Sequence, residues 1–465
     1  MTSTPRQAPS RRRLLGTAAK AAGLAGLGAF GAAGALGTAG CAAPASVAAG
    51  KTQLRYWHLF GGGDGVNMSA MLDVFRKEHP EFDLEVAQLQ WGAPYYTKLG
   101  MAGAGGRAPE VAALHLARLP GFGPGRLLDP FDLDLLAEHG VEPGNFPEQI
   151  WRRGAVDGKQ YAVPLDTHPI VLFYNTKICE KAGLLDGSGK LKTLRGTEEF
   201  TEALRAITKV TKRPALVTET LGPDVVGPWR IFATFYSQTG GTLLDPTGTR
   251  MTIDDEKALR ALEFMRTLTH EGLAVRRVDY NGGVAVFNAG ETGFYLNGEW
   301  EVTTFTESKL PFSMTRVPNL FGRPTVQADA HAFVLPHQKD RGGPPNEAAH
   351  AFVGWMMRHS TDWAKGGHVP AYLPTLKEPA YLKLEPQSAY RSVIEDVALD
   401  PPAWFAGSAS SMWLALGAVF SGVLTGSRTP REALDEAKSR LRELLDTPSP
   451  LGAPGAGRSR GGETA

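Results

Sequence analysis

Residues 54–86 read LRYWHLFGGGDGVNMSAMLDVFRKEHPEFDLEV, and this stretch decides the fold class. It opens with the pattern of a β-strand, and a glycine-rich turn follows at residues 61–65. Apolar residues then recur at helical spacing over residues 68–75, and Pro80 ends the helix. Residues 82–86 alternate between apolar and polar side chains, which predicts a second strand. A strand, a helix and a strand in this order predict the start of a parallel α/β layer.

The same alternation of strands and helices continues along the chain. Short buried strands are predicted at residues 111–114 and 171–174. Thr197 is expected to cap one helix, and residues 254–268 are expected to form another. The last helix has the clearest beginning, because residues 429–432 combine a capping box with proline at the first helical position.

Both ends of the chain lie outside this pattern. Residues 1–40 resemble an export signal, since residues 10–15 (SRRRLL) resemble the twin-arginine motif and the second half carries no charge. Residues 38–41 (TAGC) resemble the lipobox of bacterial lipoproteins, in which the Cys41 thiol receives a lipid. The alternative is an uncleaved membrane anchor, and in either case the globular part lies outside the cytoplasm. A polar tether is expected at residues 42–51 and a disordered tail at residues 447–465.

Charge and cysteine content limit the class of protein. Without residues 1–40, 44 of the 49 basic side chains remain against 48 acidic ones, a net charge of −4. Such a mixed, mildly acidic surface offers no footprint for nucleic acid. Once Cys41 is acylated, Cys179 has no partner for a disulfide within the chain, and it is expected to be a buried, inert thiol. The remaining chain of about 400 residues then needs apolar cores alone and predicts roughly two domains.

Eight short motifs, in order, resemble the family 1 extracellular solute-binding proteins. The most specific is DGKQYAVPLD at residues 157–166, followed by FYN at residues 173–175. It is similar to the segment in which the chain of that family first crosses between lobes. The matches run from about residue 52 to residue 446, so the chain is identified as a member. The other motifs are YWH with GGDG (56–58, 62–65), APEV (108–111), EKAGL (180–184), FNAGE (287–291), LNGEW (296–300), VPA (369–371) and EALDEA (432–437).

The resemblance implies an α/β protein with the two-lobe, periplasmic-binding-protein-like fold, in which a ligand cleft lies between lobes joined by crossing hinge segments. Lobe 1 would hold residues 52–164 and 308–362, and lobe 2 would hold residues 165–307 and 363–446. The resemblance further implies a receptor that delivers a mono- or oligosaccharide to the permease of an ABC importer, with the ATPase as an indirect partner. It would be a monomer, held by a lipid on Cys41 at the outer face of the cell membrane.

A sugar has hydroxyl groups around its edge and an apolar face, so its site needs aromatic rings together with carboxylates, amides and imidazoles. Asp166 and His168 are the first candidates, because they lie at the expected crossing between lobes. The alternative is a loop aspartate beside a surface histidine. Trp57, His58 and Asp64 follow, on the loop that leaves the first strand, where α/β folds bind ligands. The alternative there is a flexible turn.

Five further candidates complete the predicted site. His115 follows the strand at 111–114, and Trp300 with Asn297 belongs to a motif that commonly faces the cleft in the family. Trp229 and Tyr372 are added as possible aromatic platforms. The alternative for these aromatic residues is a place in the core.

The sequence predicts neither a cofactor, a metal site nor an enzyme. The eleven histidines show no H-E-x-x-H spacing, and the chain has no G-x-S-x-G motif and no clear acid–base pair. Two rival hypotheses stay open. One is a surface-anchored carbohydrate-active enzyme, and the other is a binding protein for a non-sugar solute such as a peptide or a polyamine.

Overall fold

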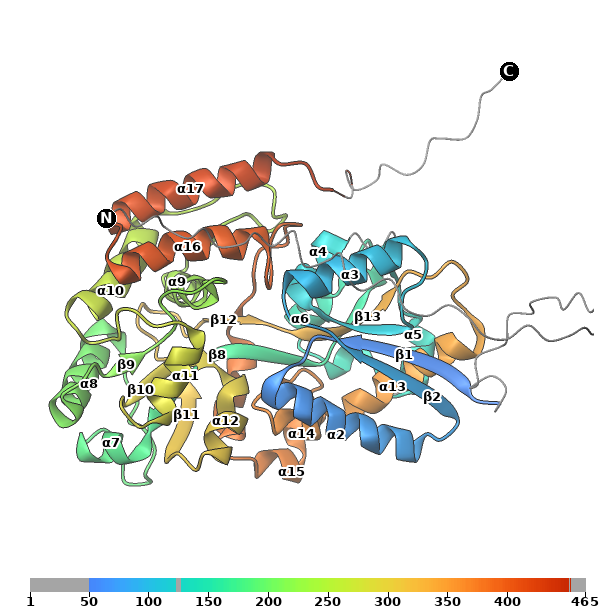
Figure 1. Ribbon diagram of the computed structural model, residues 1–465, viewed down its shortest axis with the longest axis horizontal. Coiled ribbons are helices and arrows are strands. Elements are labelled where there is room, and N and C mark those ends of the chain that lie inside the picture. Colours follow the sequence, from blue (N-terminus) through green and yellow to red (C-terminus); the bar gives the residue numbers. More distant parts are fainter. Residues whose placement is uncertain (1–49, 123–126, 451, 453–465) are drawn as a thin grey trace, which may run out of the picture. The chain divides into compact units, whose positions relative to one another are not determined.

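The computed structural model describes residues 50–122, 127–450 and 452, which form a two-lobe fold (Figure 1). The predicted signal sequence, Cys41, most of the tether and most of the tail lie outside the described residues. Within the described part of the chain, no helix combines the length and apolar character needed to cross a membrane.

The first lobe is built on a sheet with the strand order β2-β1-β3-β13-β4, with β7 paired to β13. Strand β1 pairs in parallel with β2 and β3, which confirms the parallel layer predicted from residues 54–86. Strand β13 comes from much later in the chain and pairs antiparallel to β3. The strands are β1 (Thr52–His58), β2 (Phe82–Gln88), β3 (Val111–His115), β4 (Leu128–Asp129), β7 (Ala162–Pro164) and β13 (His331–Pro336); β5 (Ala155–Val156) and β6 (Lys159–Gln160) form a separate hairpin.

The second lobe is built on a sheet with the order β15-β12-β8-β10-β9, and β11 and β14 also pair with β8. Strand β8 is its longest strand and is buried along its whole length. The strands are β8 (Asp166–Asn175), β9 (Leu216–Val217), β10 (Phe294–Gly298), β11 (Phe312–Arg316), β12 (Val326–Asp329), β14 (Val369–Pro370) and β15 (Val397–Ala398).

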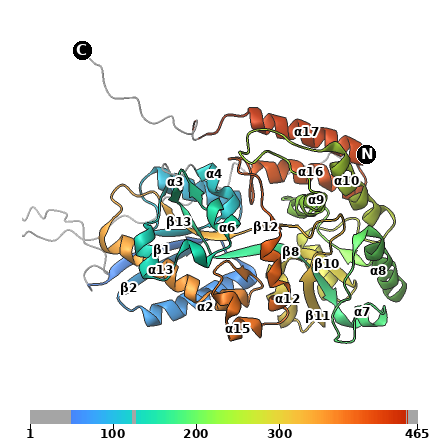
Figure 2. The ribbon, with the colours of Figure 1, turned by 180° about the vertical axis from the view of Figure 1, so that it is seen from behind.

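Helices cover both sheets, and Figures 1 and 2 show α16 and α17 side by side over the second lobe, close to α9 and α10. The longer helices are α2 (Gly62–Glu78), α3 (Ala93–Ala104), α8 (Gly196–Thr211), α9 (Val226–Gln238), α10 (Asp255–His270), α11 (Tyr280–Asn288), α13 (Gly343–Arg358), α16 (Ser411–Thr425) and α17 (Pro430–Asp446). The shorter ones are α4 (Leu119–Phe122), α5 (Leu133–Glu138), α6 (Glu148–Arg153), α7 (Thr176–Lys181), α12 (Val302–Glu307), α14 (Ser360–Ala364) and α15 (Pro379–Leu382).

The chain passes between the two sheets at Leu165, between β7 and β8, and again at Ala330, between β12 and β13. The first crossing lies where the sequence places it. The second does not, because residues 308–362 were assigned to lobe 1. Strands β11 and β12 in that range pair with β8 in the second sheet, an arrangement set by partners more than a hundred residues away.

Separate apolar cores lie on the two faces of the first sheet. Along β13, Phe333 packs in one core, and Val334 packs in the other. This alternation follows from the strand period of two residues. Cys179 is buried in the core of the second lobe, as expected, and burial raises the pKa of its thiol to about 12.

Local helix signals were predicted with mixed accuracy. The Thr429–Glu432 capping box is present at the start of α17, and Asp254 caps α10. Thr197 does not cap α8, because the helix already begins at Gly196. The glycines predicted to form a turn at 61–65 instead begin α2, which starts at Gly62.

Candidate functional site

A cavity of about 590 Å³ is lined by residues from both sheets. The loop after β1, the end of β3 and the start of β13 form one side, and segments around β8, β9, α9 and α11 form the other. The lining side chains that carry polar groups or rings are Phe60, Asp64, Trp91, His115, His168, Glu219, Asp224, Arg230, Asp279, Tyr280, Asn281, Trp300, Glu301 and His331.

Tyr280 connects the aromatic and acidic parts of the cavity wall. Its hydroxyl donates to the Glu301 carboxylate and accepts from Trp300 Nε1 at 2.6 Å and from Asn297 Nδ2 at 3.3 Å. Because burial raises the pKa of Tyr280 well above its usual value, the phenol keeps its proton. The network therefore fixes the Trp300 ring at the edge of the cavity beside a carboxylate.

Arg230 covers one face of the Trp300 indole. Its guanidinium carbon lies 4.6 Å from the ring centroid of Trp300 and 5.2 Å from that of Trp413. Glu219 nearby accepts from the backbone N–H of Gly227 at 2.8 Å, and burial raises the pKa of its carboxyl group. These contacts hold the second-lobe side of the cavity in one arrangement.

Acidic groups outnumber basic ones in the cavity. Arg230 is the single Lys or Arg among the lining residues, whereas the carboxylates are Asp64, Glu219, Asp224, Asp279 and Glu301. Burial also raises the pKa of Glu301. The cavity therefore suits a ligand that donates hydrogen bonds or carries positive charge.

Three imidazole rings line the side of the cavity nearest the crossing strands. The ring centroids of His168 and His331 are 4.2 Å apart, and that of His115 lies 4.6 Å from His331. Burial lowers the pKa of His168 to about 3 and that of His115 well below its usual value, so both rings are neutral at neutral pH. Neutral imidazoles can both donate to and accept from hydroxyl groups.

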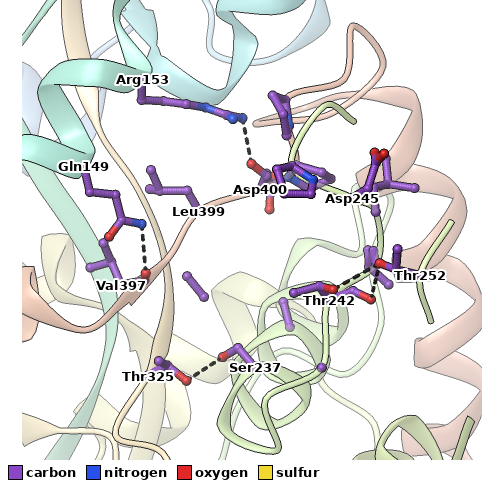
Figure 3. A pocket seen from close by; sticks show the side chains of 18 of the residues that line it. Gln149, Arg153, Ser237, Thr242, Asp245, Thr252, Thr325, Val397, Leu399 and Asp400 are labelled. Carbon is purple, nitrogen blue, oxygen red and sulfur yellow. Dashed lines mark hydrogen bonds between the residues drawn. The ribbon is translucent and has the colours of Figure 1, made fainter. Parts of the chain in front are cut away.

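A larger hollow of about 1080 Å³ lies between α6, the end of α9 and the segment around β15 (Figure 3). Two of its polar side chains bond across it: Gln149 donates to the Val397 carbonyl at 3.5 Å, and Arg153 donates to the Asp400 carbonyl at 2.7 Å. We assign the site to the smaller cavity, because residues of β3, β8 and β13, and hence of both sheets, line it.

The cavity brings together four of the predicted site residues: Asp64, His115, His168 and Trp300. Two more lie directly behind its wall. Asp166 accepts from His168 Nδ1 at 3.1 Å, and Asn297 donates to Tyr280. Their positions give them the role of holding lining side chains in place.

Four predicted residues lie elsewhere. Trp57 faces a shallow depression beside α3, where Lys98 covers its ring. His58 is buried beside Tyr56 and Phe60, and Trp229 packs on Phe420 in the second-lobe core. Tyr372 belongs to a first-lobe core and donates to the Gly140 carbonyl. The alternative of a place in the core holds for Trp229 and Tyr372.

Sequence reasoning missed ten of the fourteen polar or aromatic lining residues, among them Glu219, Arg230, Tyr280, Glu301 and His331. Glu301 follows Trp300 directly and could have been included with it. Glu219 follows β9, a strand of only two residues, so no pattern marked its end. Nothing in the sequence links His331 to His168 across 163 positions.

One cluster among the described residues has the composition of a metal site. Asp166, His168, His331 and His368 each offer a ligand atom, and these atoms lie within 4.8 Å of one another.

Comparison with known proteins identifies relatives. A family model described as bacterial extracellular solute-binding protein matches residues 62–361, more than half of the chain. The arabinooligosaccharide-binding protein of Halalkalibacterium halodurans is 25% identical over 227 residues, which are 48% of this chain and 46% of that protein. The protein of the same name from Bacillus subtilis is 25% identical over 233 residues, 49% of each chain. The chain thus covers about half the length of the curated relatives it matches.

Solved structures agree on the fold. The GacH receptor of Streptomyces glaucescens, solved without ligand and with acarbose, matches with a TM-score of 0.71 at 21% identity, covering 85% of this chain and 98% of that chain. The cyclic α-maltosyl-1,6-maltose binding protein from Arthrobacter globiformis matches with a TM-score of 0.69 at 21% identity, covering 85% and 99%. The predicted two-lobe, periplasmic-binding-protein-like fold is therefore confirmed.

Proposed function

Because the chain belongs to the bacterial extracellular solute-binding proteins, we propose that it captures a sugar in the cavity between its lobes and delivers it to the permease of an ABC importer. The observation that carries the proposal is the cavity itself, where the Trp300 ring lies beside carboxylates from both sides of the cleft. Relatives named for arabino-, malto- and galacto-oligosaccharides support an oligosaccharide as ligand.

The chemistry of the lining fits a sugar. The part of the Trp300 ring that lines the cavity would stack on the C–H groups of a pyranose or furanose ring. Asp64 on one lobe and Glu301 on the other would accept hydrogen bonds from hydroxyl groups, and such charge-assisted bonds are roughly twice as strong as neutral ones. A ligand that bonds to both lobes stabilises the closed form, which the permease would recognise.

The proposal includes export and lipid attachment. It is supported by the resemblance of residues 10–15 to a twin-arginine signal and of residues 38–41 to a lipobox. Replacing Cys41 with alanine should abolish incorporation of labelled fatty acid and release the protein from the membrane fraction. Continued membrane association of the unlabelled variant would instead indicate an uncleaved anchor.

Binding is tested with the purified protein by thermal shift and titration calorimetry against arabino-, malto- and galacto-oligosaccharides, with spermidine and a short peptide in the same assay. We expect saturable binding of one sugar class, with the sugar recovered intact by chromatography. Recovery of shortened sugar would support an enzyme. Binding of spermidine alone would support an amine receptor, which the excess of carboxylates also fits.

Variants locate the site. Trp300→Ala should weaken sugar binding, whereas Trp57→Ala, a matched tryptophan outside the cavity, should leave it unchanged. Equal losses of sugar affinity in the two variants would mean that the cavity is not the sugar site.

A further inference from the structure

A buried cluster of four residues, here called the hinge cluster, lies where the chain crosses between the lobes. It consists of Asp166 and His168 at the start of β8, His331 at the start of β13, and His368 just before β14. All four residues are at most 5% exposed. Burying a carboxylate and three imidazoles together is costly unless hydrogen bonds among them, with protons suitably placed, or a bound cation satisfies their polar atoms.

We propose that the hinge cluster binds a divalent transition-metal ion, with Zn²⁺ as the best match. Three imidazole nitrogens and one carboxylate oxygen form a donor set that suits zinc. At bond lengths of 2.0–2.1 Å, ligand atoms in a tetrahedral site lie about 3.3 Å apart. The Asp166 oxygens lie 3.1 Å from His168 Nδ1, 2.8 Å from His331 Nδ1 and 3.4 Å from His368 Nδ1. The Asp166 oxygens thus lie at ligand spacing from all three imidazoles, and the four ligand atoms lie within 4.8 Å of one another.

Unpartnered polar atoms give independent support. His368 Nδ1 lies 3.0 Å from Glu299 Oε1, yet neither this nitrogen nor either oxygen of Glu299 makes a well-aligned hydrogen bond within the described residues. Both side chains are fully buried. Buried polar atoms without partners are costly, and a cation at this position would satisfy them. Glu299 is therefore an additional candidate ligand.

The surroundings of the cluster resemble those that orient metal ligands. His368 Nε2 donates to Asp64 Oδ1 at 2.9 Å, which leaves Nδ1 directed into the cluster. A ligating histidine almost always donates its other N–H to a carboxylate, a carbonyl or water in this way. Trp363 Nε1 donates to Asp166 Oδ2 at 2.6 Å, and the Trp363 ring stacks on His368 at 4.6 Å between centroids. Both contacts fix the ligands before an ion arrives.

The ion would have a structural role. The cluster is buried, and its ligands come from the two crossing segments at Leu165 and Ala330 and from the segment just before β14. His168 and His331 also line the cavity, so the ion would fix part of its wall. This proposal goes beyond sugar binding, because metal binding can be measured without any sugar.

The test uses the purified protein after treatment with EDTA. We expect titration with Zn²⁺ to show one tight equivalent, and titration with Co²⁺ to give the visible absorption of a tetrahedral, nitrogen-rich site. His368→Gln should lose at least 100-fold in Zn²⁺ affinity, and Asp64→Asn, which removes an orienting carboxylate, should lose about 10–100-fold. His270→Gln, an exposed histidine at the end of α10, is the matched control and should bind as the wild type does.

Three results would overturn the proposal. One is wild-type protein that takes up no Zn²⁺ or Co²⁺, and this result does not depend on whether any variant folds. The second is tight binding that survives in His368→Gln. The third is binding that is lost in His270→Gln, which would show a surface site. In the first case the cluster would be a proton network, with His368 as an imidazolium between carboxylates.

Discussion

Gly298 offers a sharp test of the role of Trp300. A Cβ atom added at Gly298 would lie 1.9–2.2 Å from three atoms of the Trp300 ring. The backbone of Gly298, with φ −71° and ψ 151°, accommodates alanine, so Gly298→Ala should perturb the ring and not the strand. Carbon atoms need about 3.5 Å of separation, so the ring must move by about 1.5 Å. A shift of this size breaks the 2.6 Å bond to Tyr280.

The expected loss follows from the area of the ring face. A buried tryptophan removes 150–250 Å² from solvent, and one face is roughly a third of that. At about 25 cal/mol per Å², losing the face costs about 1.5 kcal/mol, or about tenfold in Kd for the sugar. Titration calorimetry measures the change, and Gly144→Ala, where an added Cβ meets no atom within 4 Å, is the control.

A double-mutant cycle separates displacement of the ring from any other effect of the alanine. In a Trp300→Ala background the clashing atoms are gone, so adding Gly298→Ala should cause no further loss. A second tenfold loss in that background, or unchanged affinity in Gly298→Ala alone, would refute the assignment of Trp300 as the sugar platform.

Two further predictions concern stability. Burial raises the pKa of Asp400 to about 7. A carboxyl group whose pKa is raised in the folded state adds to the free energy of unfolding at acidic pH. This contribution is lost as the pH rises from about 4 through about 7. Asp400→Asn keeps an acceptor for Trp413 Nε1, so the free energy of unfolding, measured in urea, should fall less steeply with pH in this variant. An unchanged dependence on pH would mean that Asp400 does not titrate between about pH 4 and 7. Thr429→Ala removes the cap of α17 and should lower the free energy of unfolding by about 1 kcal/mol, whereas a loss below about 0.3 kcal/mol would mean that the cap is redundant.

The parts of the fold predicted correctly depend on local signals. The parallel pairing of β1 with β2 follows from one strand–helix–strand segment, and the capping box at Thr429 spans four residues. The second crossing at Ala330 could not be found in this way. It depends on β12 pairing with a strand about 160 residues earlier, and neither strand carries a mark of its partner.

The same distinction applies to the site. Asp64 and His115 line the cavity, and both follow or end strands at the edge of the sheet where ligands are expected to bind. Trp57 and His58 lie outside the cavity because they still belong to β1, and the cavity begins only at Leu59. Trp229 was expected to be an aromatic platform like Trp300, but its ring packs on Phe420 inside a core. Composition alone cannot separate a platform from a core residue.

The hinge cluster and the cavity share His168 and His331, so binding of the ion and binding of the sugar should be coupled. Linkage requires that, if Zn²⁺ changes the affinity for sugar by some factor, sugar changes the affinity for Zn²⁺ by the same factor. His368→Gln isolates this effect, because His368 is a proposed ligand of the ion that does not line the cavity. We expect Zn²⁺ to tighten sugar binding by wild-type protein and to have no effect on His368→Gln. Equal sugar affinity of the wild type with and without Zn²⁺ would show that Asp166 alone fixes the two shared rings, through its bonds to their Nδ1 atoms.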